Sequence, residues 1–327
     1  MAKVSVLVAV YNAEKYLCEC LGSLLRQTLR DIQIICIDDC STDNSLAVLR
    51  RYASSDDRID VIALPENRGQ AFARNEGLKR ARGMYTCMLD ADDWFSADAL
   101  ERAVEVFEAH PDTDSVLFEV QMIEAGKTPY MYAMPQFDSM SGDEAFEQSL
   151  TWRIHGLYMT RTALHRRYPY DTTCRLFSDD NTTRIHYLRS RSVRRCTGIY
   201  CYRQHPSSAT HAVSVRRFDY LRANESMRRQ MTEAGANARQ LAEYENHRWL
   251  NLVDIYMFYH CHGRELPPDD RRYGLDEIKR TWQTIDRSVL DRRTTSKFGY
   301  RPMPSWGLFR VQEWLYFTLR GIIGKNR

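Results

Sequence analysis

An alternation of apolar runs with helical patterns in the first 110 residues is the feature that most constrains the fold. Four runs are rich in β-branched residues and almost continuously apolar: residues 4–10, 32–37, 59–64 and 84–89. Runs of this kind are typical of strands buried on both faces of a parallel sheet. Helical patterns follow them at residues 14–27, 44–52, 70–81 and 97–110. The sequence therefore predicts an α/β fold, Rossmann-like, with a mostly parallel central sheet flanked by helices.

The remainder of the chain gives a less regular pattern. A further strand is predicted at residues 115–120, and helix caps are predicted at residues 41–44 and at Ser96. Residues 121–145 have a mixed pattern that predicts no element. After residue 211 the chain becomes charged and helical in pattern, which predicts a C-terminal helical extension.

Composition and charge exclude several classes of protein. Hydrophobic residues make up 43% and charged residues 27%, the balance of a folded protein and not of a disordered one. The formal charge of +3 gives no reason to expect a nucleic-acid partner. Arginine pairs are concentrated after residue 150, and two interpretations of them stay open: solvated faces, or contact with an anionic membrane or a phosphorylated acceptor.

The cysteines and the N-terminus indicate a cytoplasmic protein. Nine cysteines are scattered without a C-x-x-C, so neither a zinc site nor a disulfide framework is predicted. The N-terminus enters a strand directly, without the pattern of a signal peptide. No later apolar run has the length of a membrane span.

Carboxylates follow two of the predicted strands, at the edge where ligands of open α/β sheets bind. Asp38 and Asp39 follow the second strand, and Asp90, Asp92 and Asp93 follow the fourth. These negative charges would repel one another without a cation between them, and Mg²⁺ or Mn²⁺ bound to a diphosphate would supply it. An extended backbone would place the side chains of Asp90 and Asp92 on the same side, converging on one ion.

Two common nucleotide-binding motifs are missing from the sequence. No G-x-G-x-x-G follows the first strand, and no G-x-x-x-x-G-K is present anywhere. A dinucleotide-dependent dehydrogenase or a P-loop NTPase is therefore excluded, and the metal is expected to take over the role of the phosphate-binding loop.

Four motifs in order resemble the family-2 glycosyltransferases of the GT-A fold. They are Val10-Tyr11-Asn12 after the first strand, the D-D-C-S-T-D of residues 38–43, the N-R-G and A-R-N-E-G of residues 67–77, and the D-A-D-D of residues 90–93. Val10 stands where the family usually has proline, and Cys40 where it has glycine. The resemblance extends from residue 4 to about residue 210.

The resemblance implies roles for the residues near the donor. Asp39 would bond the nucleotide base, Arg74 would approach the donor, and Asp92 would be the principal metal ligand beside Asp90. For Asp38, capping of the following helix is an alternative role. The implied donor-binding set is Ala9, Tyr11, Asn12, Glu14, Asp38, Asp39, Arg68, Arg74, Asp90, Ala91 and Arg203. The implied metal set is Asp92, Asp90 and His205.

The acceptor side is implied by later segments. Asp179 and Asp180 resemble the family's E-D motif, so Asp180 is expected to be the catalytic base, although a role for Asp179 and a solvated loop pair stay open. Residues 200–210 resemble a Y-x-Y-R segment that closes over the donor phosphates. Trp152 and Tyr158 would contact the acceptor, with a place in the core as the alternative.

Together these features predict an inverting glycosyltransferase. It would move a hexosyl or N-acetylhexosaminyl group from a nucleotide-diphosphate sugar, with UDP favoured, to a hydroxyl of a glycan or lipid-linked acceptor. A GT-A domain is expected at residues 1–210, with a nucleotide-sugar half (1–100) and an acceptor half (101–210), and a helical region at 211–327. The alternatives are a non-catalytic nucleotide-sugar or glycan binder and a sugar nucleotidyltransferase, although the glycine-rich signature of the latter is missing after the first strand.

The last segment, residues 305–327, combines an apolar helical face with aromatic and basic residues. Leu308, Val311, Leu315 and Ile322 share the face, and Arg310 lies nearby. Three interpretations stay open: a peripheral contact with the inner face of the cell membrane, docking on its own domain, or contact with a second subunit in a homodimer.

Overall fold

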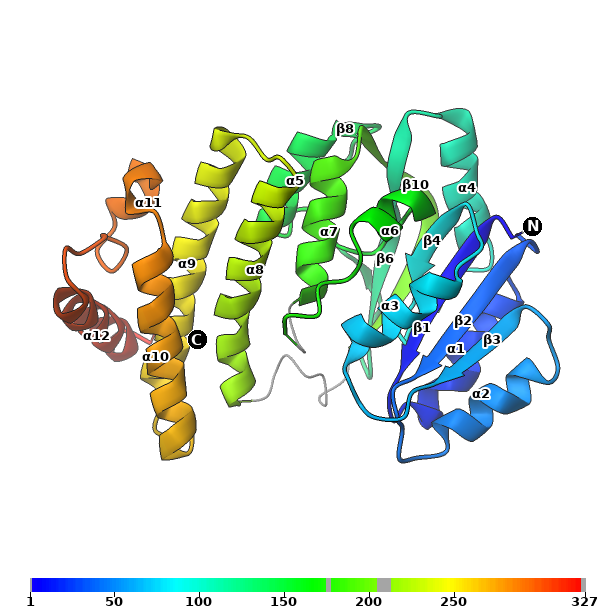
Figure 1. Cartoon of the computed structure of the whole chain (residues 1–327), viewed down its shortest axis with the longest axis horizontal. Coiled ribbons are helices and arrows are strands. Elements are labelled where there is room, and N and C mark those ends of the chain that lie inside the picture. The colour runs from blue at the N-terminus through cyan, green and yellow to red at the C-terminus, as the bar shows by residue number, and fades with distance from the viewer. Residues whose placement is uncertain (1, 175–177, 205–212, 325–327) are drawn as a thin grey trace. The chain divides into compact units, whose positions relative to one another are not determined.

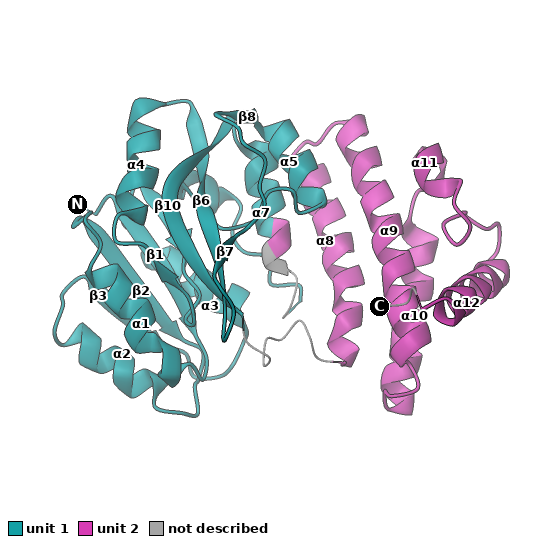
Figure 2. Ribbon diagram, turned by 180° about the vertical axis from the view of Figure 1, so that it is seen from behind, with its two compact units in different colours: residues 1–175, 182–208 teal, residues 176–181, 209–327 magenta. Residues whose placement is uncertain are grey.

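The structure is a computed structural model that describes residues 2–174, 178–204 and 213–324, apart from the side chains of Ser178 and Asp179. His205 lies outside these ranges. The chain divides into two compact units (Figure 2). The first contains residues 1–175 and 182–208, and the second contains residues 176–181 and 209–327. The division into domains at residue 210 stays a prediction from the sequence.

The first unit is built on a mixed sheet whose strands run in the order β3-β2-β1-β4-β9-β6-β10-β5 (Figure 1). The strands of this path are β1 (Val4–Val10), β2 (Ile32–Asp38), β3 (Ile59–Ala63), β4 (Tyr85–Met88), β5 (Trp94–Phe95), β6 (Thr113–Glu124), β9 (Tyr158–Arg161) and β10 (Ser192–Gln204). The pairs among β3, β2, β1 and β4 are parallel, as is the β6–β10 pair. Strand β9 is antiparallel to both of its neighbours, β4 and β6. The sheet is thus mostly parallel, as predicted.

All five strands expected from the sequence are present, and the first four helical patterns form helices. These are α1 (Glu14–Leu25), α2 (Ser45–Ala53), α3 (Gln70–Arg80) and α4 (Ala99–Ala109). One expected cap is wrong: Asp98 and not Ser96 occupies the N-cap position of α4. The hydroxyl of Ser96 instead donates to the Asp98 carboxylate at 3.1 Å, so it acts two residues before the helix begins.

The segment without a predicted element contains short pieces that serve the sheet. Strand β7 (Tyr130–Met131) pairs with β6, and β8 (Met140–Ser141) pairs with β10. Helix α5 (Gly142–Leu150) follows β8 directly. Its start is fixed by a capping box in which the Ser141 hydroxyl accepts from the Glu144 N–H and the Glu144 carboxylate accepts from the Ser141 N–H.

The parallel strands are covered on both faces, which explains their continuous apolar runs. Val6 and Val8 belong to a core that α1 and α4 share, whereas Leu7 and Ile37 belong to a second core with α3. Helix α3 lies close to the sheet at Gly77, since a Cβ on this residue would be only 2.6 Å from Cδ1 of Ile37. The glycine of the A-R-N-E-G motif therefore sets the distance between the helix and the strand ends.

The second unit is helical, as predicted. Its main helices are α8 (Asp219–Glu233), α9 (Ala238–His262), α10 (Pro268–Thr284) and α12 (Trp306–Ile322). They enclose a core in which Trp249 and Phe309 are fully buried. The short elements η1 (Val215–Phe218), η2 (Arg287–Val289) and α11 (Arg292–Thr295) complete the unit. Among the helices that the structure describes, none combines the length and apolar character that crossing a bilayer requires.

The remaining helices flank β9 and β10. Helix α6 (Thr162–Arg167) follows β9 directly, and α7 (Ser178–Arg189) precedes β10. Residues 178–181 of α7 belong to the second unit, and the rest of the helix belongs to the first.

Candidate active site

The loops that follow β1 and β2 are hydrogen-bonded to each other. Asn12, in the left-handed conformation with φ of 51°, accepts from the Thr42 N–H at 2.7 Å through its side-chain oxygen. Its own N–H donates to the Ser41 hydroxyl at 3.0 Å. The Glu14 carboxylate accepts from the Asn44 N–H at 2.8 Å. Asn12 and Glu14, both predicted to bind the donor, therefore hold the two strand-end loops together.

Tyr11 and Ala9 occupy different environments at the end of β1. Tyr11 leaves the strand with half of its surface exposed, at 51%. Ala9 is half-buried within the strand. A ring exposed at the carboxyl end of a parallel strand is available for stacking on a base or a ribose. This exposure agrees with the role that the resemblance implies for Tyr11.

Asp38 and Asp39 are both buried and both bind backbone amides. Asp39 accepts from the N–H groups of Arg68 at 2.8 Å and Gly69 at 2.7 Å, one with each carboxylate oxygen. Asp38 accepts from the Ser41 N–H at 3.2 Å, which closes the turn after β2. Each oxygen of Asp39 keeps a second lone pair, so the same carboxylate can also accept from a nucleotide base.

The loop between these carboxylates and α2 keeps the shape expected for a glycine. Cys40 has φ of 61°, which lies in the left-handed region that L-residues other than asparagine and aspartate rarely adopt. Its thiol points to the carbonyl oxygen of Pro65, with Sγ and O 3.7 Å apart. The loop thus survives the replacement of the family's glycine, at the expense of local backbone strain.

A buried ion pair fixes the first carboxylate after β4. Arg74 of α3 is 1% exposed, and one of its terminal nitrogens lies 2.5 Å from Oδ1 of Asp90. The guanidinium also lies over the ring of Tyr170, 5.4 Å from its centre. Asn75 holds Tyr170 in place by bonding both its backbone N–H, at 2.9 Å, and its carbonyl, at 2.8 Å. The A-R-N motif therefore positions Asp90 instead of leaving Arg74 open to solvent.

The D-A-D-D segment is a turn, and the prediction of an extended backbone there was wrong. The N–H of Asp93 donates to the carbonyl of Asp90 at 3.0 Å, which closes the four residues. Ala91 is buried, whereas the side chain of Asp90 is 31% exposed and Asp92 is partly exposed. In this turn the side chain of Asp93 is buried and contacts β10.

Asp93 joins this turn to β10 and was missed as a site residue. It is 2% exposed and accepts from the Tyr200 hydroxyl at 2.8 Å and from the Arg203 N–H at 2.7 Å. The Tyr200 hydroxyl in turn accepts from the Asp90 N–H at 3.1 Å. Burial raises the pKa of Asp93 to about 8, and the charges of Asp90 and Asp92 add to the shift. The sequence feature that could have indicated Asp93 is its place directly after the D-A-D of residues 90–92.

Arg203 lies beside Asp92, held by the protein itself. Its Nε donates to the Asp92 carbonyl at 2.9 Å, and its terminal nitrogen pairs with Glu19 of α1. Its guanidinium stacks over the rings of Trp94, at 4.6 Å, and Tyr16, at 5.3 Å. The structure therefore brings Arg203 to the carboxylate turn, as expected, but the partners Glu19 and Trp94 had no signal in the sequence.

Arg68 lies at the start of α3, beside the loop that Asp39 holds. Its guanidinium stacks on the ring of Phe72, 3.7 Å from the ring centre. Half of its side chain is exposed, and it forms a long ion pair of 3.8 Å with the exposed Glu66. Exposed pairs of this kind contribute little, so this cation can exchange Glu66 for an anionic ligand.

The carboxylates of the turn fit a divalent cation. They are hard oxygen donors, and the charges of Asp90 and Asp92 add to the rise that burial causes in the pKa of Asp93. Among the residues that the structure describes, no three histidine, cysteine or acidic side chains form a metal-binding group. Mg²⁺ and Mn²⁺ do not need one, because they typically take one or two protein carboxylates together with phosphate oxygens.

The predicted acceptor residues are only partly brought to one place. Trp152 is 40% exposed, accepts at its carbonyl from the Tyr132 hydroxyl, and packs against the guanidinium of Arg184 at 5.3 Å. Tyr158 instead donates its hydroxyl to Nδ1 of His186 at 2.6 Å. That histidine bonds the Tyr168 carbonyl through Nε2, and burial lowers its pKa to about 4. Tyr158 thus has the contacts of a core aromatic.

The predicted base residues lie at the start of α7. Asp180 is partly exposed and belongs to the second unit. Asp90 and Asp92 belong to the first unit. The side chain of Asp179 lies outside the described part of the chain. The assignment of the base therefore stays a prediction.

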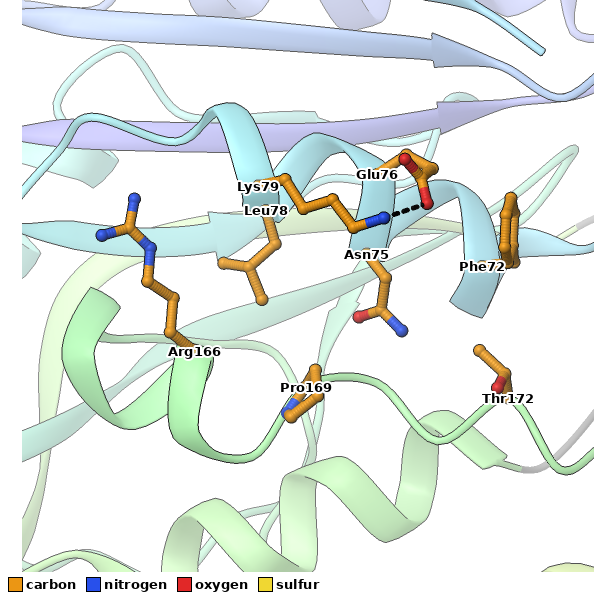
Figure 3. Close-up of a pocket in the computed structure, with 8 residues that line it drawn as sticks. All are labelled: Phe72, Asn75, Glu76, Leu78, Lys79, Arg166, Pro169 and Thr172. Carbon is orange, nitrogen blue, oxygen red and sulfur yellow. Dashed lines mark hydrogen bonds and ion pairs between the residues drawn. The ribbon is translucent and has the colours of Figure 1, made fainter.

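A separate open pocket of about 560 Å³ lies along the other face of α3 (Figure 3). Phe72, Asn75, Glu76 and Lys79 line it at helical spacing, opposite Arg74, and Arg166 and Pro169 line its other side. On the α3 side of the pocket, Lys79 and Glu76 form an ion pair of 2.6 Å (Figure 3). Among the residues that line this pocket in the described part of the chain, none belongs to the predicted donor, catalytic or metal set, so it is distinct from the carboxylate turn.

Comparisons with known proteins agree with this arrangement. S. aureus TarS 1–349 in complex with UDP-GlcNAc has the same fold, with a TM-score of 0.77 over 99% of this chain and 92% of that chain at 20% identity. The mannosyltransferase PcManGT from Pyrobaculum calidifontis, in complex with GDP-Man and Mn²⁺, gives a TM-score of 0.53 over 99% of this chain and 88% of that chain at 17% identity. These likenesses confirm the expected GT-A fold.

Sequence comparisons identify the family. The glycosyltransferase EpsJ of Bacillus subtilis (strain 168) is 31% identical over 221 residues, which are 63% of this chain and 62% of EpsJ. The matched stretches span 36%, 62% and 40% of the lengths of three curated relatives from that organism. Residues 5–171 match the family described as Glycosyl transferase family 2. Because this match covers half of the chain, the protein belongs to glycosyl transferase family 2.

Proposed function

We propose that this protein is a glycosyltransferase that moves a hexosyl or N-acetylhexosaminyl group from a UDP-sugar to a hydroxyl of a glycan or lipid-linked acceptor, with inversion at the anomeric carbon. The observation that carries the proposal is the carboxylate turn at the end of β4, where Asp90 is fixed by Arg74 and Asp92 lies beside Arg203. The UDP-GlcNAc bound to TarS supports UDP as the donor nucleotide.

The donor would be held by residues of three strand ends. Tyr11 would stack on the base or ribose, because its ring is exposed at the end of β1. The lone pairs that Asp39 keeps would accept from the base, and Arg68 would meet a phosphate in exchange for Glu66. The interlocked loops fix these side chains relative to one another, which lowers the entropy lost on binding.

Asp92 and Asp90 would hold Mg²⁺ or Mn²⁺, and the Mn²⁺ bound to PcManGT supports this choice. When bound, such an ion neutralises the charge that develops on the departing diphosphate. Arg203 would stabilise the same charge from the side of β10, provided that it exchanges Glu19 for phosphate oxygens. His205, two residues after Arg203, is proposed to support the same group.

Asp180 would act as the base. Its carboxylate would take the proton of the acceptor hydroxyl while that oxygen attacks the anomeric carbon and the bond to the diphosphate breaks. Attack from the face opposite the leaving group inverts the configuration in one step, so no covalent glycosyl-enzyme forms. A lipid-linked acceptor would place the reaction at the cytoplasmic face of the membrane.

Calorimetric titration tests the donor site. UDP, GDP and dTDP would be titrated with Mn²⁺ present, with CMP as control, into the native chain, the Asp92→Ala variant and an Asp112→Ala variant that changes an exposed carboxylate outside the site. We expect UDP to bind the native chain only when the metal is present. The Asp92→Ala change should weaken UDP binding, whereas the Asp112→Ala change should not. If no nucleotide binds under any metal, the alternative of a glycan-binding protein replaces the donor-site proposal.

A second measurement separates the chemistry from binding. Asp180→Asn should bind UDP as tightly as the native chain and yet lose release of UDP from a UDP-sugar. If Asp180→Asn keeps full UDP release, Asp180 is not the base and the equivalent variant of Asp179 becomes the candidate. Formation of a UDP-sugar from UTP and a sugar phosphate would instead indicate the nucleotidyltransferase alternative.

A further inference from the structure

Helix α12 has two apolar faces, and the second unit covers only one of them. On the inner face, Phe309 and Phe317 are buried, and the ring of Phe309 lies 5.7 Å from the rings of both Trp249 and Tyr256. On the outer face, large apolar side chains are exposed by 42 to 77%. They are Leu308, Val311, Trp314, Leu315, Leu319, Ile322 and Ile323. We call these seven side chains the outer face.

The outer face is continuous along the helix. Leu308, Val311, Leu315, Leu319 and Ile322 follow one another at spacings of three, four, four and three residues, which places them in a single stripe. A stripe of this length exposes far more apolar surface than scattered surface leucines do, and such patches mark interaction surfaces. Something other than water is therefore expected to cover the outer face.

The charges around α12 are almost entirely positive. Residues 292–324 contain six basic residues, which are Arg292, Arg293, Lys297, Arg301, Arg310 and Arg320, and a single acid, Glu313. Glu313 is fully buried, and burial raises its pKa to about 8. Asp291, just before the segment, accepts from the Arg293 N–H at 2.6 Å. Helix α12 thus exposes the cation of Arg310 and no carboxylate.

An aromatic and an arginine side chain lie beside one edge of the outer face. Arg310 and Trp314 lie one helical turn apart on one flank, and Trp314 is 55% exposed. Arg320 lies toward the inner side, where it donates to the Tyr316 hydroxyl at 3.4 Å and its guanidinium is 6.0 Å from the ring centre of the buried Phe317. Amphipathic helices at the surface of a bilayer combine apolar, aromatic and basic residues in this way.

We infer that the outer face of α12 lies in the surface layer of a membrane that contains anionic lipids. The apolar stripe would enter the boundary between headgroups and acyl chains, and the cations would contact lipid phosphates. A second copy of the chain is a poorer occupant, because a twofold contact along this helix would bring the arginines of one copy near those of the other. The inference uses the second unit alone and does not depend on the donor or the base.

Cosedimentation with vesicles tests the inference on the full chain. We expect binding to vesicles of mixed phosphatidylcholine and phosphatidylglycerol, weaker binding at high salt, and little binding to phosphatidylcholine alone. The double change Leu315→Asp and Leu319→Asp should lower the partition coefficient by more than about tenfold. Replacing Arg310 by Gln should lower it by about fivefold, the factor expected for one cation near an anionic surface.

Leu250→Asp is the matched control, because Leu250 is a leucine of α9 with a similar exposure of 41%. It should leave vesicle binding unchanged. Circular dichroism and UDP titration should be unchanged in every variant, since the substituted side chains are exposed and lie outside the first unit. A chain that binds UDP normally but ignores anionic vesicles would refute the membrane inference without touching the proposed function.

Two further outcomes would also overturn the inference. Vesicle binding that survives the double leucine change would show that another surface is responsible. Light scattering that finds a dimer for the native chain and a monomer for the double variant, both without lipid, would assign the outer face to a second copy.

Discussion

The buried carboxyl group of Asp93 should make the stability of the protein fall as pH rises, and Asp93→Asn should remove that dependence. Burial raises the pKa of Asp93 to about 8 in the folded chain, against an ordinary value of 3.8 in the unfolded chain. Between these two values the unfolded chain has lost the proton and the folded chain still holds it. The folded state therefore binds more protons, so the free energy of unfolding decreases as pH increases.

The magnitude follows from the size of the shift. Each pH unit within this window changes the free energy of unfolding by up to about 1.4 kcal/mol. From pH 5 to pH 7 the free energy of unfolding of the native chain should therefore fall by about 3 kcal/mol relative to that of Asp93→Asn. The asparagine has nearly the shape of the acid but cannot titrate, and its carbonyl oxygen has two lone pairs with which to accept from the Arg203 N–H and the Tyr200 hydroxyl.

Urea unfolding at several pH values between 5 and 8 measures this difference. Each curve would be compared with that of Asp112→Asn, an exposed carboxylate whose removal should not alter the slope. The difference between the native chain and Asp93→Asn should grow with pH. Parallel pH profiles for these two proteins would refute the reasoning, because they would mean that Asp93 is already ionised in the folded state.

Three other changes have expected outcomes that denaturation can check. Cys40→Gly should raise the free energy of unfolding by about 0.5–1 kcal/mol, because φ of 61° strains an L-residue, whereas Cys40→Ala should give no gain. Gly198→Ala should lower it by about 1–3 kcal/mol, since the new Cβ would lie 2.7 Å from Cα of Ala99; Gly307→Ala, with open space around it, should not. Arg74→Met should lower the free energy of unfolding by about 1–3 kcal/mol and weaken UDP binding, because Asp90 loses its cation. If Arg74→Met bound UDP as tightly as the native chain, the ion pair would have no role in donor binding.

The sequence predicted the parallel half of the sheet because burial on both faces leaves a direct mark. Strands β1 to β4 are short, continuous and apolar, and the helices between them carry one apolar face each. Strand β10 leaves no such mark: it starts with Ser192, contains Arg194 and Arg195, and changes register before Ile199. Its place beside β6 depends on contacts between residues far apart in the chain.

Prediction of the site from the sequence is limited in the same way. The positions of the carboxylates could be predicted from the motifs, but not the partners that orient them. Tyr200 reaches Asp93 across 107 residues, and Glu19 reaches Arg203 across 184. The extended backbone predicted for D-x-D was also wrong, and the turn found there places Asp93 in contact with residues of β10 that lie 107 and 110 residues away in the sequence. Local spacing carries no information about such pairs.

The hydrogen bonds between the loops after β1 and β2 also bear on how donor preference can be altered in this protein. The backbone of residues 12–14 is bonded to side chains of residues 41–45, and Asn12 and Glu14 bond the backbone of Thr42 and Asn44 in return. A chimera that exchanged only one loop would leave N–H groups of the other without acceptors. The two loops therefore form a single exchangeable part, and a relative's donor site would have to be transplanted as the pair.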